Sequence, residues 1–504
     1  MMSGGINFER ALEKIVFFEQ ENDVTKIKYH DIRIWPLLRA HIVRSWLVED
    51  LQPLETRKQG AEKLKKRPLF RRLEICIREK IKHFMAQKKL ARKGKNKIWV
   101  LPGQLGHAER IEEGLVDRFA DTLQVVLPRE DLFKLVFSSS KKINNFVYPA
   151  FNYELGHLTH RAFWQNKNNP IKFSDITDYS KIISLIDSDL EEFNERFKKD
   201  LGLILVYAND MTKVLSASKP KAIFTVCYYS IVNLAILLAA KRVGIPVIDI
   251  QHGKQGSYNV NYTHFTEVPK NGWDLLPNYF WSWGSTSAEN ISRHLPAKLK
   301  THKPVVIGYP WLSLWKTGHP FKLPEEHMSF LERIKKADMS ILVTLQPLAD
   351  PISEVLLEAM EKAPEGWLWL IRMHPNMVFN KAELIERIAK VAPTKFEVEI
   401  SSEISLYPLL KSVKHHVTAW SSVAYEASAL RIPTSLIDPT ALQLYSDEIY
   451  RGEFLYSETG QALLKNISLS KQCMSVVPSQ YIEADLSENI QKLNLFLKDE
   501  LGLL

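Results

Sequence analysis

The sequence lacks several features that would assign it to a class at once. Its 504 residues include only three cysteines, Cys76, Cys227 and Cys473. Their odd number and wide spacing exclude a disulfide framework and a cysteine-ligated zinc site, and they suit a reducing cytoplasm. The longest apolar run, 231–240, is about half the length of a membrane span. Because charges also occupy the place of a signal peptide's apolar core, we expect a soluble cytoplasmic protein.

Familiar catalytic signatures are missing as well. The chain contains no GKS/T phosphate loop, no HExxH zinc motif and no GxSxG nucleophile elbow. Nothing in the sequence therefore points to a P-loop nucleotidase, a zinc protease or a serine hydrolase. We expect an activity that needs neither a metal ion nor another cofactor.

Positive charge is concentrated in one segment. The whole chain has a net charge of +9, whereas residues 57–97 hold 17 Lys or Arg and only three acids. Apolar residues recur in this segment at three- and four-residue steps, and this pattern predicts a basic amphipathic helix. The apolar positions are Phe70, Leu73, Ile77, Ile81 and Phe84.

Three interpretations of the basic segment stay open. The helix could pack its apolar stripe on the protein body and leave its charges in water. It could lie on an anionic inner-membrane leaflet, where each Lys or Arg contributes on the order of 1 kcal/mol. It could also bind nucleic acid, but no aromatic platform or zinc-finger spacing accompanies the charge. We therefore expect no nucleic-acid partner, and an anionic membrane surface is the macromolecular partner that 57–97 predicts.

Strand and helix patterns divide the chain into five segments. Two of them, 96–310 and 338–480, alternate apolar strands with helices of roughly 10–15 residues, which predicts parallel sheets. The first of these begins with the strands predicted for 96–104 and 123–128. We predict an α/β fold of two Rossmann-like domains facing across a cleft. The other segments are a helical and basic N-terminal part, a linker rich in proline and aromatic residues, and a C-terminal helix: 1–95, 311–337 and 481–504.

A strand end in the second α/β unit carries a His-Pro motif. The apolar stretch WLWLI places Arg372 and His374 at the carboxyl end of a strand, and Pro375 ends it. Ligands of doubly wound sheets bind at such ends. Taken alone, the motif could equally be a structural strand cap.

A second strand end in the same unit carries a Ser-Ser motif. Ser421 and Ser422 precede a predicted helix that contains Glu426 one turn further on. Hydroxyls and free N–H groups at a helix start favour a phosphate, and carboxylates commonly hold ribose hydroxyls. An ordinary N-capped helix with a routine glutamate would look the same.

Together, the two motifs resemble those of GT-B glycosyltransferases of bacterial surface polysaccharide synthesis. The likeness is greatest to the capsule Kdo transferases and the sialyl- and polysialyltransferases, which use CMP-activated acidic sugars. The resemblance implies that His374, Ser421 and Ser422 hold the donor phosphate and that Glu426 contacts the ribose or base. It also makes the first domain the acceptor domain and the second the donor domain.

The loop after the first strand of the second domain adds to this resemblance. The stretch LVTLQPLAD, 342–350, resembles a glutamine-containing strand-end loop of the capsule Kdo transferases. The resemblance implies that Gln346 and Asp350 lie near the donor.

In the first α/β unit, the strand VIDI runs into Gln251-His252-Gly253-Lys254. This His-Gly is similar to that of teichoic-acid glycerophosphotransferases, where it is the proposed base. Gly253 would allow close approach of a sugar or phosphate, and Lys254 could neutralise phosphate. For His252, a base, a ligand of the donor phosphate or carboxylate, and a structural role all stay open.

Kdo and sialyl transferases usually take their base from an Asp or Glu of the first domain. The carboxylates to test are Glu109, in a loop and helix start that also holds Gln104 and His107, and Asp249, which precedes the QHG motif. An acid inside an apolar strand could equally be a buried structural partner.

These observations predict a glycosyltransferase that moves Kdo or a related acidic sugar from a CMP-linked donor to a surface glycan or glycolipid. The enzymatic alternatives are a CDP-polyol phosphotransferase of teichoic-acid type, a UDP-sugar-using GT-B enzyme, and a sugar-nucleotide epimerase, which shares the GT-B fold. The remaining alternative is a membrane-peripheral polysaccharide-assembly protein without activity. We expect it in the cytoplasm, at the face of the inner membrane.

Overall fold

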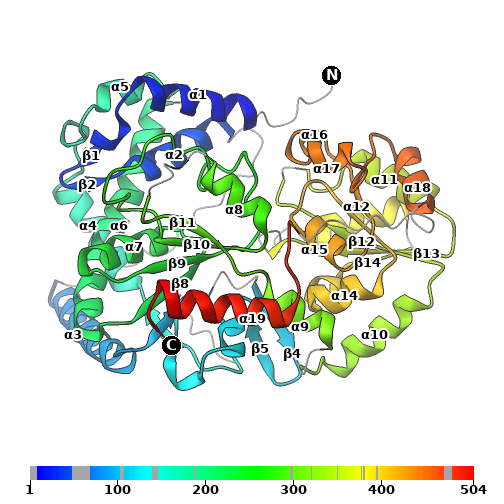
Figure 1. Cartoon of the computed structure of the whole chain (residues 1–504), viewed down its shortest axis with the longest axis horizontal. Helices are drawn as coiled ribbons and strands as arrows, with labels where there is room; N and C mark the ends of the chain where they lie inside the picture. Colours follow the sequence, from blue (N-terminus) through cyan, green and yellow to red (C-terminus); the bar gives the residue numbers. More distant parts are fainter. Residues whose placement is uncertain are drawn as a thin grey trace.

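A computed structural model provides the structure of the chain. It describes residues 8–47, 69–102, 107–138, 146–186, 189–293, 295, 299–318, 321–348, 350–375, 377, 381–392, 395–469 and 480–503. Two parallel sheets lie side by side, one in each half of the molecule (Figure 1). The α/β class and the two Rossmann-like domains predicted from the sequence are confirmed.

The first domain is built on a seven-stranded parallel sheet. Its order is β11-β10-β9-β8-β3-β6-β7, with β3 at Ile98–Val100, β6 at Leu132–Ser138, β7 at Phe151–Glu154, β8 at Ala222–Val226, β9 at Val247–Ile250, β10 at Tyr279–Ser282 and β11 at Lys303–Val306. The buried α7 (Ile231–Val243) packs against α6 (Leu190–Ser218), and Gly244 ends α7 in the left-handed conformation, with φ of 74°. Glycine adopts this conformation without a steric cost.

The second domain is built on a six-stranded parallel sheet. Its order is β14-β13-β12-β15-β16-β17, with β12 at Met339–Thr344, β13 at Trp367–Arg372, β14 at Phe396–Glu397, β15 at His415–Thr418, β16 at Thr434–Leu436 and β17 at Leu455–Tyr456. Its helices include α11 (Glu354–Lys362), α12 (Lys381–Val391), α13 (Glu399–Glu403), α14 (Leu406–Ser412), α15 (Val423–Ala429), α16 (Thr440–Leu444), α17 (Ser446–Tyr450) and α18 (Gly460–Leu469). The continuous burial of β12 and β15 is typical of strands covered on both faces.

Two local predictions differ from the structure. The strand predicted for 123–128 is wrong, because a 3₁₀ helix occupies Asp121–Val125. Asp121 accepts a hydrogen bond from the backbone N–H of Asp117 at 2.8 Å, and such local bonds compete with strand pairing. The helix start expected at Glu109 is also wrong: the residue lies in an antiparallel hairpin of β4 (Ala108–Ile111) and β5 (Gly114–Asp117). The stretch 311–337 is largely helical.

The chain passes between the domains in both directions. It leaves the first domain through α9 (Pro310–Thr317) and α10 (Glu325–Lys335), and it returns through α19 (Leu486–Leu495), which packs on α9 (Figure 1). Ser313 of α9 donates a hydrogen bond to Asn489 of α19 at 2.6 Å. The outgoing and returning segments therefore form one packed unit.

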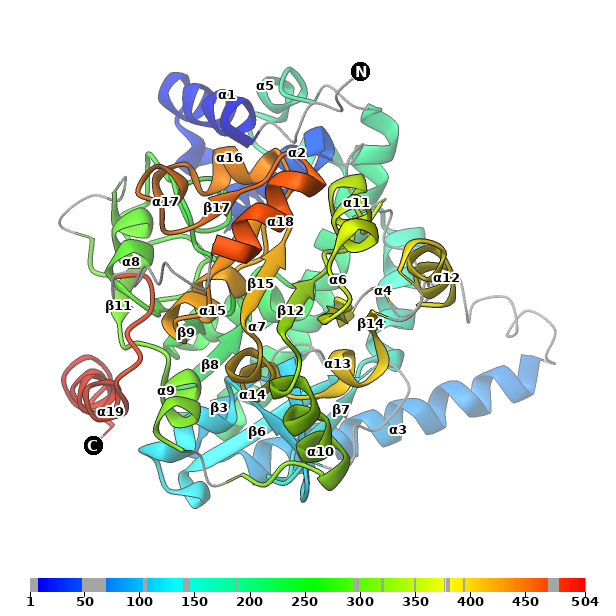
Figure 2. The same cartoon turned by 90° about the vertical axis from the view of Figure 1, so that its right-hand side faces the viewer.

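Helices of the N-terminal segment lie at two opposite ends of the first domain (Figures 1 and 2). They are α1 (Phe8–Glu21), α2 (Trp35–Leu47) and the long basic α3 (Leu69–Lys93). Residues 57–68 of the basic segment lie outside the described residues. No helix in the described ranges is both long enough and apolar enough to pass through a bilayer.

Candidate functional site

The His-Gly and Ser-Ser motifs meet where the two domains face each other. Gly253 follows β9, and Ser422 precedes α15. A Cβ added to Gly253 would lie 3.4 Å from the Ser422 hydroxyl oxygen. Parallel strands of the two sheets thus bring their carboxyl ends together, as in other doubly wound folds that bind ligands there. Even the smallest side chain at 253 would therefore be in van der Waals contact with Ser422.

The Ser-Ser loop is held by the Gln346 loop. Trp420 donates its backbone N–H to the side-chain oxygen of Gln346 at 2.8 Å, and Ser421 accepts from the N–H of Val423 at 3.3 Å. Ser422 makes no capping hydrogen bond with its side chain. The hydrogen bond from Trp420 to Gln346 therefore fixes the Ser-Ser loop. The Ser422 side chain faces Gly253 of the first domain. Asp350 lies elsewhere, in an exposed ion pair of 2.5 Å with Arg387.

An arginine that the sequence analysis missed lies at the centre of the domain contact. Arg118 follows β5, and the carboxylates of Glu109 and Glu426 act on it from the first and second domains. Loss of water lowers the pKa of Arg118, but Tyr309, Tyr407 and the two carboxylates outweigh this effect and raise it above its ordinary value. The guanidinium is therefore a fixed cation between the domains.

Both carboxylates beside Arg118 are buried. Glu109 accepts a hydrogen bond from Ser405 of the second domain at 2.9 Å. Glu426 accepts one from Tyr407 at 2.5 Å, and Tyr407 is in turn 2.6 Å from the hydroxyl of Tyr309. Burial raises the pKa of each carboxyl, although Arg118 opposes the shift. Glu426 thus belongs to this network, and its carboxylate is hydrogen bonded by Tyr407.

Three histidines approach the same place. The rings of His107 and His252 lie 5.9 Å apart, and His374 is close enough to lower the pKa of His107 further. Burial is the main cause of the low pKa of all three, and it brings that of His252 to about 4, with help from Arg118. Each imidazole is therefore neutral near pH 7. We refer to this group as the interdomain cluster: His107, Glu109, Arg118, His252, Arg372, His374 and Glu426.

Arg372 and Pro375 complete the His-Pro motif at the end of β13. Arg372 donates to the backbone carbonyls of Ser401 and Ile404 at 2.8 and 2.6 Å. Burial lowers the pKa of Arg372 to about 10, so it stays cationic near neutral pH. Pro375 is exposed at the end of the strand. The motif places His374 between this anchored arginine and the first domain.

The His252 loop is shaped by its neighbour Gln251. The Gln251 amide donates to the carbonyl of Gly253 at 2.8 Å and to the hydroxyl of Ser287 at 3.0 Å, and it accepts from the N–H of Trp283 at 2.6 Å. These bonds fix the turn and leave His252 near Tyr229, whose hydroxyl is 3.3 Å away. Gln251 is therefore a positioning residue of this loop.

Asp249 is held inside the first domain. It accepts hydrogen bonds from the N–H of Tyr228 at 2.9 Å, the hydroxyl of Tyr262 at 2.9 Å and the hydroxyl of Thr225 at 3.3 Å. Burial raises its pKa to about 7 despite these three donors. Of the two interpretations that the sequence left open, this geometry matches that of a buried structural partner.

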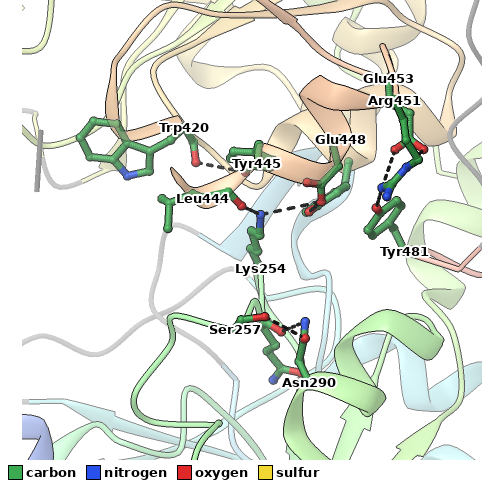
Figure 3. A network of polar contacts seen from close by, with 12 residues as sticks. Lys254, Ser257, Asn290, Trp420, Leu444, Tyr445, Glu448, Arg451, Glu453 and Tyr481 are labelled. Carbon is green, nitrogen blue, oxygen red and sulfur yellow. Dashed lines mark hydrogen bonds and ion pairs between the residues drawn. The ribbon is translucent and has the colours of Figure 1, made fainter. Parts of the chain in front are cut away.

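Lys254 extends from the same loop to the second domain (Figure 3). Its ammonium donates to the carbonyl of Leu444, lies 3.9 Å from Glu448 and sits 3.6 Å from the ring centre of Tyr445. Burial lowers the pKa of Lys254 to about 8, although Glu448 and Asp447 raise it. We call this contact the lysine latch: Lys254, Leu444, Tyr445 and Glu448.

A cavity of about 660 Å³ opens beside the lysine latch. Its walls come from α1, the 251–258 loop, α8 (Ser285–Ser292) and the α16–α17 region. They carry amides, hydroxyls and charges of both signs, including Asn290, Arg293 and Arg451. Ser257 donates to Asn290 at 3.0 Å on this wall (Figure 3). A polar pocket of this size suits a hydroxylated molecule.

The sequence found three of the motifs that meet here but missed Arg118, Tyr309 and Tyr407. These residues belong to no recognisable motif, and Arg118 lies in a hairpin that was not predicted. Gln104 lies outside the described residues. Among the described residues, no group of three or more His, Cys, Asp or Glu side chains is placed to hold a metal ion.

No family model and no curated protein matches the sequence. Several solved structures share its fold. A Listeria monocytogenes protein assigned as a UDP-N-acetylglucosamine 2-epimerase is 12% identical, with a TM-score of 0.50 over 81% of this chain and 97% of that one. The UDP-GlcNAc 2-epimerase of Methanocaldococcus jannaschii is 13% identical, with a TM-score of 0.49 over 79% and 99%. The wall teichoic acid polymerase TagF is 11% identical, with a TM-score of 0.40 over 84% and 92%. The likeness to the Listeria monocytogenes structure, together with the two parallel sheets, shows the GT-B fold that the sequence predicted.

Proposed function

We propose that the protein is a GT-B glycosyltransferase that transfers a sugar from a nucleotide donor to a glycan or glycolipid acceptor without a metal ion. The contact between Gly253 and Ser422 carries this proposal, because it joins the ends of two parallel sheets at a site rich in histidine and arginine. Transfer from a nucleotide sugar needs cationic and dipolar groups at the departing phosphate and a base at the acceptor hydroxyl.

In this proposal the donor phosphate binds between Ser422, His374 and His252. A phosphate placed there would raise the pKa of a neutral imidazole and favour its charged form, which then offsets the leaving group's charge. Arg118 would add a permanent cation. Glu109 is the proposed base, since its raised pKa brings it closer to neutrality. Asp249 is a weaker candidate, because three donors already occupy its carboxylate.

For the donor we propose a CMP-linked sugar, Kdo or a related acidic sugar, on the resemblance of the His-Pro and Ser-Ser motifs to the capsule Kdo and sialyl transferases. A UDP-sugar donor is the second candidate, because the Listeria structure with the same fold is assigned to a UDP-N-acetylglucosamine epimerase. The proposed acceptor lies at the cytoplasmic face of the inner membrane.

Thermal-shift titration of the full chain with CMP, CDP and UDP tests the donor. We expect CMP to raise the Tm most, because ligands that bind only the native state stabilise it. A larger shift with UDP would overturn the CMP assignment, and a larger shift with CDP would favour polyol phosphate transfer. No shift with any nucleotide would favour an assembly protein without activity.

Three substitutions test the site. Ser422→Ala and His374→Ala should each weaken nucleotide binding at least tenfold, whereas Ser468→Ala on the exposed end of α18 should leave it unchanged. Glu109→Gln should keep nucleotide binding but lower turnover at least a hundredfold. Glu113→Gln, in the exposed turn of the same hairpin, is its control. Nucleotide binding that is unchanged in both Ser422→Ala and His374→Ala would contradict the proposed donor site.

A further inference from the structure

The basic helix α3 is fixed to the first domain by one side. His83 lies 2.7 Å from a carboxylate oxygen of Asp210, and Gln87 donates to the same oxygen at 2.5 Å. Tyr153 donates to the other oxygen at 2.7 Å, and Leu90 is fully buried. His83, Gln87 and Leu90 are spaced by four and three residues, so they share one face of the helix. Polar anchors hold this side of α3 on α6 and β7.

The apolar stripe of α3 faces the other way. The side chains of Ile81, Phe84 and Met85 are 56%, 53% and 65% exposed. A helix turns about 100° per residue, which places these three on a face opposite the anchoring one. A stripe packed on the protein body, one of the three interpretations of this segment, is therefore wrong at Ile81 and Phe84. The helix projects beyond the body of the molecule (Figure 2).

Positive charges border this exposed stripe. The described part of α3 beyond residue 77 contains a single acid, Glu79, and the following exposed cations: Arg78, Lys80, Lys82, Lys88, Lys89, Arg92 and Lys93. The ammonium of Lys88 lies 4.5 Å from the ring centre of Phe84, so the cationic and apolar groups are interleaved. Long basic side chains can keep their charges in water while their stems lie along apolar surface.

The neighbouring helix α4 (Gly156–Asn168) carries a further exposed aromatic side chain. It touches α3 through the rings of His83 and His157, whose centres are 5.1 Å apart. Trp164 lies two turns further along the same face of α4 and is 44% exposed. Tryptophan is enriched where apolar and aqueous phases meet.

We propose that α3 docks the protein on an anionic lipid bilayer. Ile81, Phe84 and Met85 enter the boundary between headgroups and acyl chains, and the flanking Lys and Arg side chains contact acidic headgroups. The charge complements such a surface, and the apolar stripe selects a bilayer over a nucleic acid, because phosphodiester backbones offer nothing to bury it. This inference does not depend on the nucleotide donor.

Vesicle co-sedimentation of the full chain tests the proposal. We expect binding to vesicles of phosphatidylcholine with phosphatidylglycerol, and at least tenfold weaker binding to phosphatidylcholine alone. Phe84→Asp combined with Met85→Asp should reduce binding to the anionic vesicles at least tenfold, and so should Lys88→Glu combined with Lys89→Glu. The control Met328→Asp, at an exposed apolar position of α10, should bind as the unchanged protein does.

Because the substituted side chains are exposed, each variant should keep its Tm and its thermal shift with nucleotide. A loss of nucleotide response would instead concern the site between the domains. The proposal is overturned if Phe84→Asp with Met85→Asp binds anionic vesicles as well as the unchanged chain does. Equal binding to a DNA duplex, lost in the same variants, would also overturn it in favour of a nucleic-acid surface.

Discussion

The interdomain cluster and the lysine latch both join the two domains, but they differ in chemistry. In the cluster, the charge of Arg118 acts on carboxylates from each domain, and the three histidines of the cluster are neutral. In the latch, Lys254 alone crosses from the first domain, and a carbonyl, a ring and one carboxylate receive it. The first arrangement leaves cationic and basic groups for a ligand, whereas the second uses up its cation to hold the domains together.

Among the substitutions in the two domain contacts, removal of Arg118 should lower the free energy of unfolding most. In Arg118→Met, Glu109 and Glu426 would stay buried without the cation whose charge acts on both, and a buried charge left uncompensated costs at most about 3–5 kcal/mol. Urea unfolding should show this loss in the free energy of unfolding. Arg129→Met, a change at a surface arginine, should cost less than about 0.5 kcal/mol. A similar small loss in Arg118→Met would show that Arg118 does not hold the two carboxylates.

Removal of the hydroxyl of Tyr407 or of Tyr309 should lower the free energy of unfolding less. Tyr407→Phe removes the hydroxyl that donates to Glu426, and a buried acceptor without its donor costs about 1–3 kcal/mol. The same urea titration measures it. Tyr309→Phe should cost less, because the Tyr407 hydroxyl still binds Glu426. A larger loss in Tyr309→Phe than in Tyr407→Phe would contradict the hydrogen bond from Tyr407 to Glu426.

Loss of the lysine latch should change domain closure more than stability. Lys254→Met keeps the apolar stem but loses the contacts with Leu444 and Glu448, at a cost of about 0.5–1.5 kcal/mol. We expect a larger radius of gyration in solution scattering and faster proteolysis between the domains. Lys270→Met, at an exposed lysine of the first domain, is the control. If the two variants scatter identically, the latch does not hold the domains closed.

The smallest expected effect is the pH dependence of a single histidine. Burial lowers the pKa of His252 from 6.5 to about 4, so the unfolded chain binds the proton first as pH falls. Stability from this group is complete above pH 6.5 and declines between pH 6.5 and 4. His252→Gln should flatten the slope of unfolding free energy against pH in this window by less than one proton. An unchanged slope would show that His252 titrates alike in both states.

The sequence predicted those parts of the fold and site that depend on local patterns. Strands that end in His-Gly, His-Pro and Ser-Ser could be recognised because apolar runs stop at polar residues. The partners of these motifs depend on contacts between distant segments, such as Glu109 with Ser405. No periodicity marks Arg118 as the residue that would lie between two carboxylates.

The sequence also could not show which face of α3 is buried. The 3.6-residue pattern of α3 predicted an amphipathic helix correctly, and this says only that two faces differ. The face that meets the protein is decided by partners elsewhere in the chain, here Asp210 and Tyr153. His83 and Gln87 bind the buried carboxylate of Asp210, so their face of α3 packs on the first domain. The apolar stripe on the opposite face is therefore exposed.

The paired crossing of the chain determines how the two domains can move. Glu483, on the returning segment, donates its N–H to the carbonyl of Trp283 at 2.8 Å and accepts from the N–H of Tyr309 at 2.9 Å. Two covalent connections that are packed together restrain translation, and rotation about their common line remains the least costly motion. The domains therefore behave as two leaves on one hinge. Gly253 and Ser422 would separate or meet in the same swing that opens or closes the lysine latch.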